Sequence, residues 1–115
     1  MNLQVTKTFS FDAAHQLPWH EGKCRRLHGH TYRLEVSVGG PINENGIVVD
    51  FDDLSIVVKR AILDRFDHQL LNDYLPNPTA ELLALEFTKL LEAEGLDLSR
   101  LTVWETPTSS ATVEV

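Results

Sequence analysis

The sequence lacks several features that would place the chain in a membrane, outside the cell or on nucleic acid. No apolar run approaches the roughly 20 residues of a membrane-spanning helix, and residues 1–8 lack a basic region followed by an apolar stretch. The only cysteine, Cys24, cannot form an intramolecular disulfide, so we expect a free thiol in a reducing cytoplasm. Ten basic residues against seventeen acidic ones give a net charge of −7, which argues against binding to nucleic acid or anionic membranes.

The features that are present predict a single domain. The 115 residues, 43% of them hydrophobic, show no break in composition, so we assign residues 1–115 to one domain. Three of the ten basic residues fall at Lys23, Arg25 and Arg26. A basic cluster in an acidic chain suits a small anion, and a solvated loop has the same composition, so both interpretations stay open.

Hydrophobic periodicity predicts four strands and two helices. The strands are predicted at residues 3–11, 32–38, 101–105 and 112–115. Apolar spacing predicts one helix capped by Asp52 and another that follows Asn77-Pro78-Thr79 and ends at Gly95. We therefore predict an α+β fold of order ββααββ, in which two helices cover one face of a four-stranded antiparallel sheet.

A histidine-rich segment, residues 12–31, joins the first two predicted strands. It carries four of the five histidines, and so long a connection in a small domain is usually functional. His28 and His30 are two residues apart and project to the same side of an extended backbone, and His15 can meet them if the two strands pair. Three imidazoles with an open fourth position are typical of catalytic zinc, so we predict a Zn²⁺ site here.

The spacing alone leaves two alternatives open. His28 and His30 can be neighbouring histidines without a metal, although His15 and the nearby thiol favour the metal site. Cys24 is either a fourth ligand, which would close a structural site, or a reactive thiol beside the metal. Structural zinc sites draw mostly on several thiolates, which favours the reactive thiol. His20 is interpreted as a solvated loop residue.

Several segments resemble the motifs of the 6-pyruvoyl tetrahydropterin synthase family. Residues 24–32, CRRLHGHTY, are similar to its CxxxHGHxY signature. Further blocks follow in family order: FDAAH at 11–15, VDFDDL at 49–54, DHQLLN at 67–72, PTAE at 78–81 and VWET at 103–106. Leu82 and Val113 depart from the family pattern, which has Asn and an aromatic residue there. Three residues separate Cys24 from His28, and this spacing resembles that of the bacterial branch of the family, the 6-carboxy-5,6,7,8-tetrahydropterin synthases.

This resemblance implies a tunnelling-type fold and roles for individual residues. The residues that it assigns to catalysis are Cys24, Asp67 and His68, with zinc held by His15, His28 and His30. Glu105 and Thr79 are expected to bind a pterin substrate, with Glu81 a weaker candidate, and Arg25 is expected to bind the substrate from the basic cluster. A carboxylate such as Glu105 can accept two hydrogen bonds from the amino-pyrimidine edge of a pterin.

The resemblance also implies a reaction and an assembly. The reaction converts 7,8-dihydroneopterin triphosphate to 6-carboxy-5,6,7,8-tetrahydropterin, releases acetaldehyde and triphosphate, and serves queuosine and other 7-deazapurine biosynthesis. The alternatives are the pyruvoyl synthase reaction on the same substrate and a noncatalytic zinc-binding assembly module. The expected assembly is a homohexamer, a dimer of trimers with active sites between subunits, which would also cover the edges of a small sheet.

Overall fold

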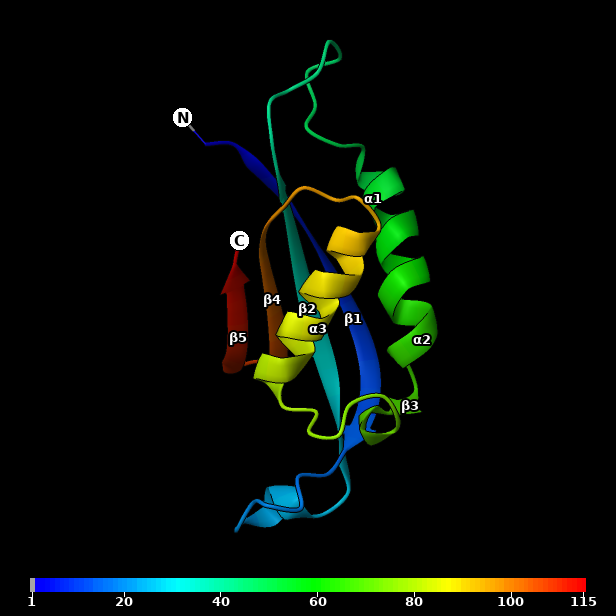
Figure 1. Cartoon of the computed structure of the whole chain (residues 1–115), viewed down its shortest axis with the longest axis vertical. Coiled ribbons are helices and arrows are strands. Elements are labelled where there is room, and N and C mark those ends of the chain that lie inside the picture. Colours follow the sequence, from blue (N-terminus) through cyan, green and yellow to red (C-terminus); the bar gives the residue numbers. More distant parts are fainter. Residues whose placement is uncertain (1) are drawn as a thin grey trace.

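The structure is a computed structural model that describes residues 2–115, and one sheet forms its frame (Figure 1). Five strands lie in the order β3-β1-β2-β4-β5. Their bounds are β1 Gln4–His15, β2 His28–Gly39, β3 Gln69–Leu70, β4 Leu98–Thr106 and β5 Ser109–Glu114. The β1–β2, β2–β4 and β4–β5 pairs are antiparallel, whereas β3 runs parallel to β1.

The pairing of β1 with β2 determines which side chains share a face of the sheet. These strands have 12 residues each and pair along their whole length, so that Phe11 lies opposite Tyr32 and His15 lies opposite His28. Side chains that lie opposite each other in an antiparallel pair point to the same face. The rings of Phe11 and Tyr32 stack at 5.0 Å between centroids on the buried face.

Two helical segments cover this buried face. The first consists of α1 (Phe51–Val58), a π-helical turn η2 (Lys59–Leu63) and α2 (Asp64–Phe66), and the second is α3 (Ala80–Ala93). The Asp50 carboxylate caps α1 by accepting a hydrogen bond from the Asp52 amide at 2.7 Å. The Thr79 hydroxyl caps α3 by accepting from the Leu82 amide at 3.2 Å. Both caps satisfy amides that have no partner inside the helix.

The hydrophobic core lies between the sheet and the helices. Its largest fully buried apolar side chains are Phe11, Tyr32, Leu34, Leu54, Ile62, Phe66, Leu71, Leu83, Phe87, Leu91 and Leu101. Burying one such side chain stabilises the fold by about 1.5–3 kcal/mol. Within the described residues, the helices leave the opposite face of the sheet uncovered, and small hydroxyl side chains are exposed there: Thr6, Thr8, Ser10, Thr31 and Thr112. Within residues 2–115, no helix is long and apolar enough to cross a membrane.

The predicted α+β class is confirmed, but the predicted four-stranded antiparallel sheet and the order ββααββ are wrong in detail. The additional strand β3 makes the sheet five-stranded and mixed, because Gln69 and Leu70 pair in parallel with Ala13 and Ala14. A strand of two residues is too short to show alternation in the sequence. The cap of α1 is Asp50 rather than the predicted Asp52, whose own amide donates to it.

The first two strands are also longer than predicted. β1 continues to His15 and β2 begins at His28, so the connection between them is reduced to residues 16–27. Asp12 and the histidines interrupt the apolar alternation, which is why the sequence alone indicated a loop there. All three predicted zinc ligands therefore lie on paired strands, which hold a side chain more rigidly than a loop does.

Candidate active site

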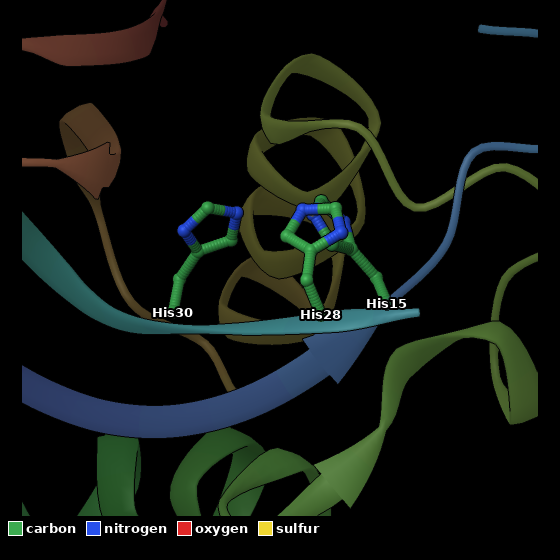
Figure 2. Close-up of side chains that lie close together, drawn as sticks. All are labelled: His15, His28 and His30. Atoms are coloured by element: carbon green, nitrogen blue, oxygen red, sulfur yellow. The ribbon is translucent and has the colours of Figure 1, made fainter. Parts of the chain in front are cut away.

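Three histidines converge where the paired ends of β1 and β2 leave the core. Figure 2 shows His15, His28 and His30 projecting from the two strands to the same side of the sheet. One ring nitrogen from each histidine lies within 4.8 Å of the other two, and the ring centroids are 4.6 to 5.1 Å apart. His15 is fully buried, and the other two are half-buried. The structure therefore brings together the three predicted metal ligands.

Two backbone carbonyl groups determine the tautomers of His15 and His28. The Nδ1 atom of His15 lies 2.9 Å from the carbonyl oxygen of Pro78, and that of His28 lies 2.7 Å from the carbonyl oxygen of Arg26. A carbonyl oxygen only accepts hydrogen bonds, so each Nδ1 carries the hydrogen and each neutral ring has its lone pair on Nε2. These two Nε2 atoms face each other at 3.0 Å. Two lone pairs at that distance repel each other unless a cation lies beside both.

His30 completes the donor set. Its Nε2 atom is buried and has no hydrogen-bond partner within residues 2–115, which is costly unless another group binds it. Burial lowers the pKa of His30, with smaller contributions from His15 and His28, although Glu105 opposes this shift. The ring is therefore held in the neutral form that ligates metals. An unpartnered nitrogen and two facing lone pairs fit a metal cation bound by three imidazoles.

A tyrosine lies behind the histidine group. The Tyr32 hydroxyl is 3.3 Å from Nδ1 of His15, and burial raises the pKa of Tyr32, with a further contribution from the Glu105 charge. Tyr32 therefore remains a neutral phenol at physiological pH. It can orient the His15 ring without adding negative charge to the donor set.

The predicted catalytic thiol lies in the connection between β1 and β2. Cys24 is the middle residue of a 3₁₀ turn, η1 (Lys23–Arg25), and its side chain is half-buried. The Leu17 amide donates to the Cys24 carbonyl oxygen at 3.0 Å and closes the loop. The thiol is not a member of the group of donor atoms within 4.8 Å of one another, so the structure brings together three ligands rather than four.

Asp67 and His68 follow the end of α2 and are in direct contact. The carboxylate of Asp67 lies 2.9 Å from Nδ1 of His68. Adjacent side chains can meet here because His68 has φ of 61°, a left-handed conformation that turns the chain sharply. The Asp12 amide donates to the Asp67 carboxylate at 2.9 Å, and this hydrogen bond is the main reason that the pKa of Asp67 is lowered, followed by its contacts with His68.

The histidine group and the Asp67–His68 pair lie on different sides of the same two strands. His15 and His30 belong to the face that the helices cover, because they share it with Phe11 and Tyr32. His68 lines a cavity together with Asp12, Gly29 and Thr31, which belong to the uncovered face. Of the three histidines, His30 also lines this cavity. The structure therefore brings together the ligands and, separately, the pair, but not the two groups.

The three predicted substrate-binding residues are distributed around the histidine group. The Glu105 carboxylate is 3.6 Å from Nε2 of His30, and both residues line a cavity of about 480 Å³ with Trp104. Thr79 directly follows Pro78, the residue that binds His15, and its hydroxyl caps α3. Arg25 is exposed in η1 and has no ion-pair partner within residues 2–115.

Sequence reasoning missed two residues that support this arrangement. Asp12 binds Asp67 through its amide, and Tyr32 contacts His15 through its hydroxyl. Asp12 lies within the FDAAH block and Tyr32 ends the CxxxHGHxY signature, so both positions were marked by the motifs. Their contacts depend on strand register, which the motifs do not contain.

The fold and the site define a small α+β protein with a preassembled three-histidine site of the kind that holds a metal. Residues 4–115 match the profile of the 6-pyruvoyl tetrahydropterin synthase family, and the chain belongs to this family. A structure of Caenorhabditis elegans 6-pyruvoyl tetrahydropterin synthase superposes with a TM-score of 0.88 at 25% identity, covering 100% of this chain and 96% of the other.

Two relatives with different names are similar along most of their length. The chain is 45% identical to a 6-carboxy-5,6,7,8-tetrahydropterin synthase of Synechocystis, over 93% of this chain and 89% of the relative. It is 38% identical to a dihydroneopterin monophosphate aldolase of Pyrococcus furiosus, over 91% of each chain. Similar sequences therefore carry the names of different pterin reactions, and the choice between these reactions depends on the site.

Proposed function

We propose that the chain is a zinc-dependent 6-carboxytetrahydropterin synthase, a lyase acting on 7,8-dihydroneopterin triphosphate. The products are 6-carboxy-5,6,7,8-tetrahydropterin, acetaldehyde and triphosphate, with one water taken up. The observation that carries this proposal is the donor set of His15, His28 and His30, two of whose neutral rings direct lone pairs at each other. The relative from Synechocystis, which is more similar than the Pyrococcus aldolase, supports the choice of reaction.

His15, His28 and His30 would hold the Zn²⁺ ion. Zinc bound there would act as a Lewis acid toward the side-chain hydroxyls of the substrate and lower the cost of removing their protons. The carbonyl groups of Pro78 and Arg26 keep two of the rings in the ligating tautomer, which raises their basicity as ligands. Of the three proposed ligands, His30 lies beside a carboxylate, that of Glu105.

The other residues would move protons and orient the substrate. Cys24 is the proposed base, and the turn that carries it also contains Lys23 and Arg25. His68 is the second proton carrier, and the Asp67 carboxylate holds its Nδ1–H and leaves Nε2 for the substrate.

Substrate binding is assigned to the surroundings of the histidine group. Glu105 would accept hydrogen bonds from the amino-pyrimidine edge of the pterin within the cavity beside His30. Thr79 would border the ring, and Arg25 would bind the triphosphate. A cavity of about 480 Å³ is within the range of small-molecule sites.

The two-sided arrangement favours a second copy of the chain as the source of His68. His15 and His28 lie on the helix-covered side of β1 and β2, whereas His68 lines a cavity on the other side, which His30 also lines. A neighbouring copy that docks its own β1 edge against the metal side would supply the missing His68. We therefore propose a homohexamer, a dimer of trimers with active sites between subunits, that works in the cytoplasm in queuosine and 7-deazapurine biosynthesis.

Product analysis tests the proposed reaction. The zinc-loaded protein is mixed with 7,8-dihydroneopterin triphosphate, acetaldehyde is detected through alcohol dehydrogenase, and the pterin is identified by mass spectrometry. We expect acetaldehyde and triphosphate in equal amounts. Triphosphate without acetaldehyde would instead indicate the pyruvoyl synthase reaction, since its product keeps all three side-chain carbons.

Two other outcomes would also reject the proposal. Release of a two-carbon fragment that keeps its phosphates would indicate an aldolase reaction, which the name of the Pyrococcus furiosus relative brings into consideration. Zinc binding without turnover of any dihydroneopterin phosphate would favour the noncatalytic assembly module.

A further inference from the structure

Asp12 makes several contacts with the Asp67–His68 pair. Both of its backbone groups are used: its amide donates to the Asp67 carboxylate at 2.9 Å, and its carbonyl oxygen accepts from the His68 amide at 2.6 Å. These bonds lie on the β1 edge, directly before the short parallel pairing of β1 with β3. The left-handed backbone of His68 is thus held between β1 and the carboxylate of its own neighbour.

The side chain of Asp12 is also held in place. Its Oδ1 atom accepts a hydrogen bond from the Thr31 hydroxyl at 2.5 Å, and the two residues are directly opposed in the β1–β2 pair. No other hydrogen bond reaches this carboxylate within residues 2–115. A bond between opposed side chains restricts the rotamer, because both backbones are held by the strand pairing.

The fixed carboxylate faces the imidazole of His68. A carboxylate oxygen of Asp12, one of Asp67 and a ring nitrogen of His68 all lie within 4.8 Å of one another. Two carboxylates this close repel each other, and a positive charge on His68 would relieve that repulsion. Among residues 2–115, the other titratable side chain that lines the cavity is that of His30, a proposed zinc ligand.

We propose that Asp12 is a positioning residue for His68: its carboxylate, locked by Thr31, is a second anionic neighbour of the imidazole, in addition to Asp67. The catalytic consequence rests on the proposed function, but the contact between Asp12 and His68 does not. Asp12 would favour the protonated ring that donates a proton, while Asp67 would set its orientation.

The direct test is NMR titration of the zinc-loaded full chain with ¹³C-labelled histidine. Bound zinc should keep its three histidine ligands from titrating, so that only the signals of His20 and His68 change with pH. A His20→Gln variant then assigns these two signals. We expect Asp12→Asn to move the His68 titration midpoint to lower pH, because the substitution removes a negative charge near the ring. Asp52→Asn, which removes a charge from the exposed first turn of α1, should leave the midpoint in place.

Variants of Thr31 test whether the hydrogen bond from Thr31 to Asp12 affects His68, or whether the charge of Asp12 alone is sufficient. Thr31→Val removes the hydroxyl at nearly constant shape and should move the midpoint in the same direction as Asp12→Asn, whereas Thr31→Ser should restore the parent value. If Asp12→Asn does not fold, the Thr31 pair decides alone. Equal midpoints for the parent, Asp12→Asn and Thr31→Val proteins would overturn the proposal.

Kinetics connect the contact to catalysis. In Asp12→Asn the limb of the pH profile that depends on His68 should shift by the same amount as the NMR midpoint, and kcat should fall severalfold with little change in KM. Absence of pterin turnover in the parent protein would refute the proposed function. The NMR result would still decide whether Asp12 is a partner of His68.

Discussion

At the scale of single residues, the site is organised by backbone atoms that do not belong to it. The carbonyl groups of Pro78 and Arg26 fix the rings of His15 and His28, and the amide of Asp12 holds Asp67. These backbone atoms cannot be removed by a side-chain substitution. The donor set is therefore preorganised by the fold, and removal of a ligand should affect metal binding more than it affects folding.

Zinc content after loss of one ligand tests this expectation. Loss of a residue that only hydrogen-bonds to a ligand costs about 10–100-fold in metal affinity, so loss of a ligand costs at least as much. We expect His28→Ala to lose most of its zinc, measured by mass spectrometry of the metal after dialysis against a weak chelator. His20→Ala is the matched control, since His20 lies in the loop and its Nδ1 only accepts from the Gly22 amide. Full zinc occupancy in His28→Ala would refute the assignment.

The sequence predicted that the three histidines lie together better than it predicted the residues that support them. His28 and His30 are separated by one residue, and this spacing is sufficient to place both on one face of a strand. The prediction that His15 lies beside them required only that the two neighbouring strands pair. The role of Asp12 could not be predicted in the same way, because it depends on the edge position of β1 and on the left-handed turn at His68.

At the scale of elements, the caps explain where the helices begin. Asp50 accepts hydrogen bonds from the amides of Asp52 and Asp53 and thereby satisfies two groups at the start of α1. The sequence VDFDDL contains three aspartates within four positions, and all are plausible caps by type. Only the extended backbone of the capping residue distinguishes them, and Asp50 has ψ of 127°.

Substitution of the cap should destabilise the protein measurably. Asp50→Ala removes both hydrogen bonds and should cost about 1 kcal/mol, which corresponds to a decrease in Tm of several degrees. Asp52→Ala is the matched control, because it removes an equal charge from the same turn and leaves the cap in place. The Tm of both variants is compared with the parent by calorimetry at one protein concentration. A decrease that is larger for Asp52→Ala would refute the assignment of the cap.

The elements that were predicted least well are those with little periodicity. β1 extends to His15 and β2 begins at His28. These extensions consist of polar, small and histidine residues, which do not show the apolar alternation of a strand that packs on a core. β3 consists of two residues and depends on pairing with β1. The two helices were placed well, since Leu83, Phe87 and Leu91 recur at helical spacing on the buried side of α3.

At the scale of the whole molecule, the chain has the features of an incomplete unit. Apolar side chains remain exposed at several places on its surface, among them Leu3, Trp19, Leu27, Ile42, Phe51 and Ile56. One face of the sheet is uncovered, and the outer edge of β5 has no neighbour within residues 2–115. Unpaired strand edges invite pairing with another chain, which association with identical copies would satisfy.

Mixing two inactive variants tests whether the sites lie between subunits. Cys24→Ala should disable the metal side of a site, and His68→Ala should disable the proton-transfer side, so each variant alone should lose nearly all activity. If both sides came from one subunit, a mixed oligomer would contain no intact site. If they come from neighbouring subunits, a Cys24→Ala chain can supply His68 to a site whose thiol comes from a His68→Ala chain.

The recovery expected from such mixing can be calculated. In oligomers reassembled at random from equal amounts of the two variants, each half of a site is intact with a probability of about one half, so about a quarter of the sites should be active. Co-expression of differently tagged chains, followed by two affinity steps, yields the mixed oligomers, and light scattering gives their size relative to the 13.0 kDa chain. Recovery near a quarter of the parent kcat would place Cys24 and His68 of one site on different subunits. Mixed oligomers that have the expected size but no activity would contradict the proposal that each active site lies between two subunits.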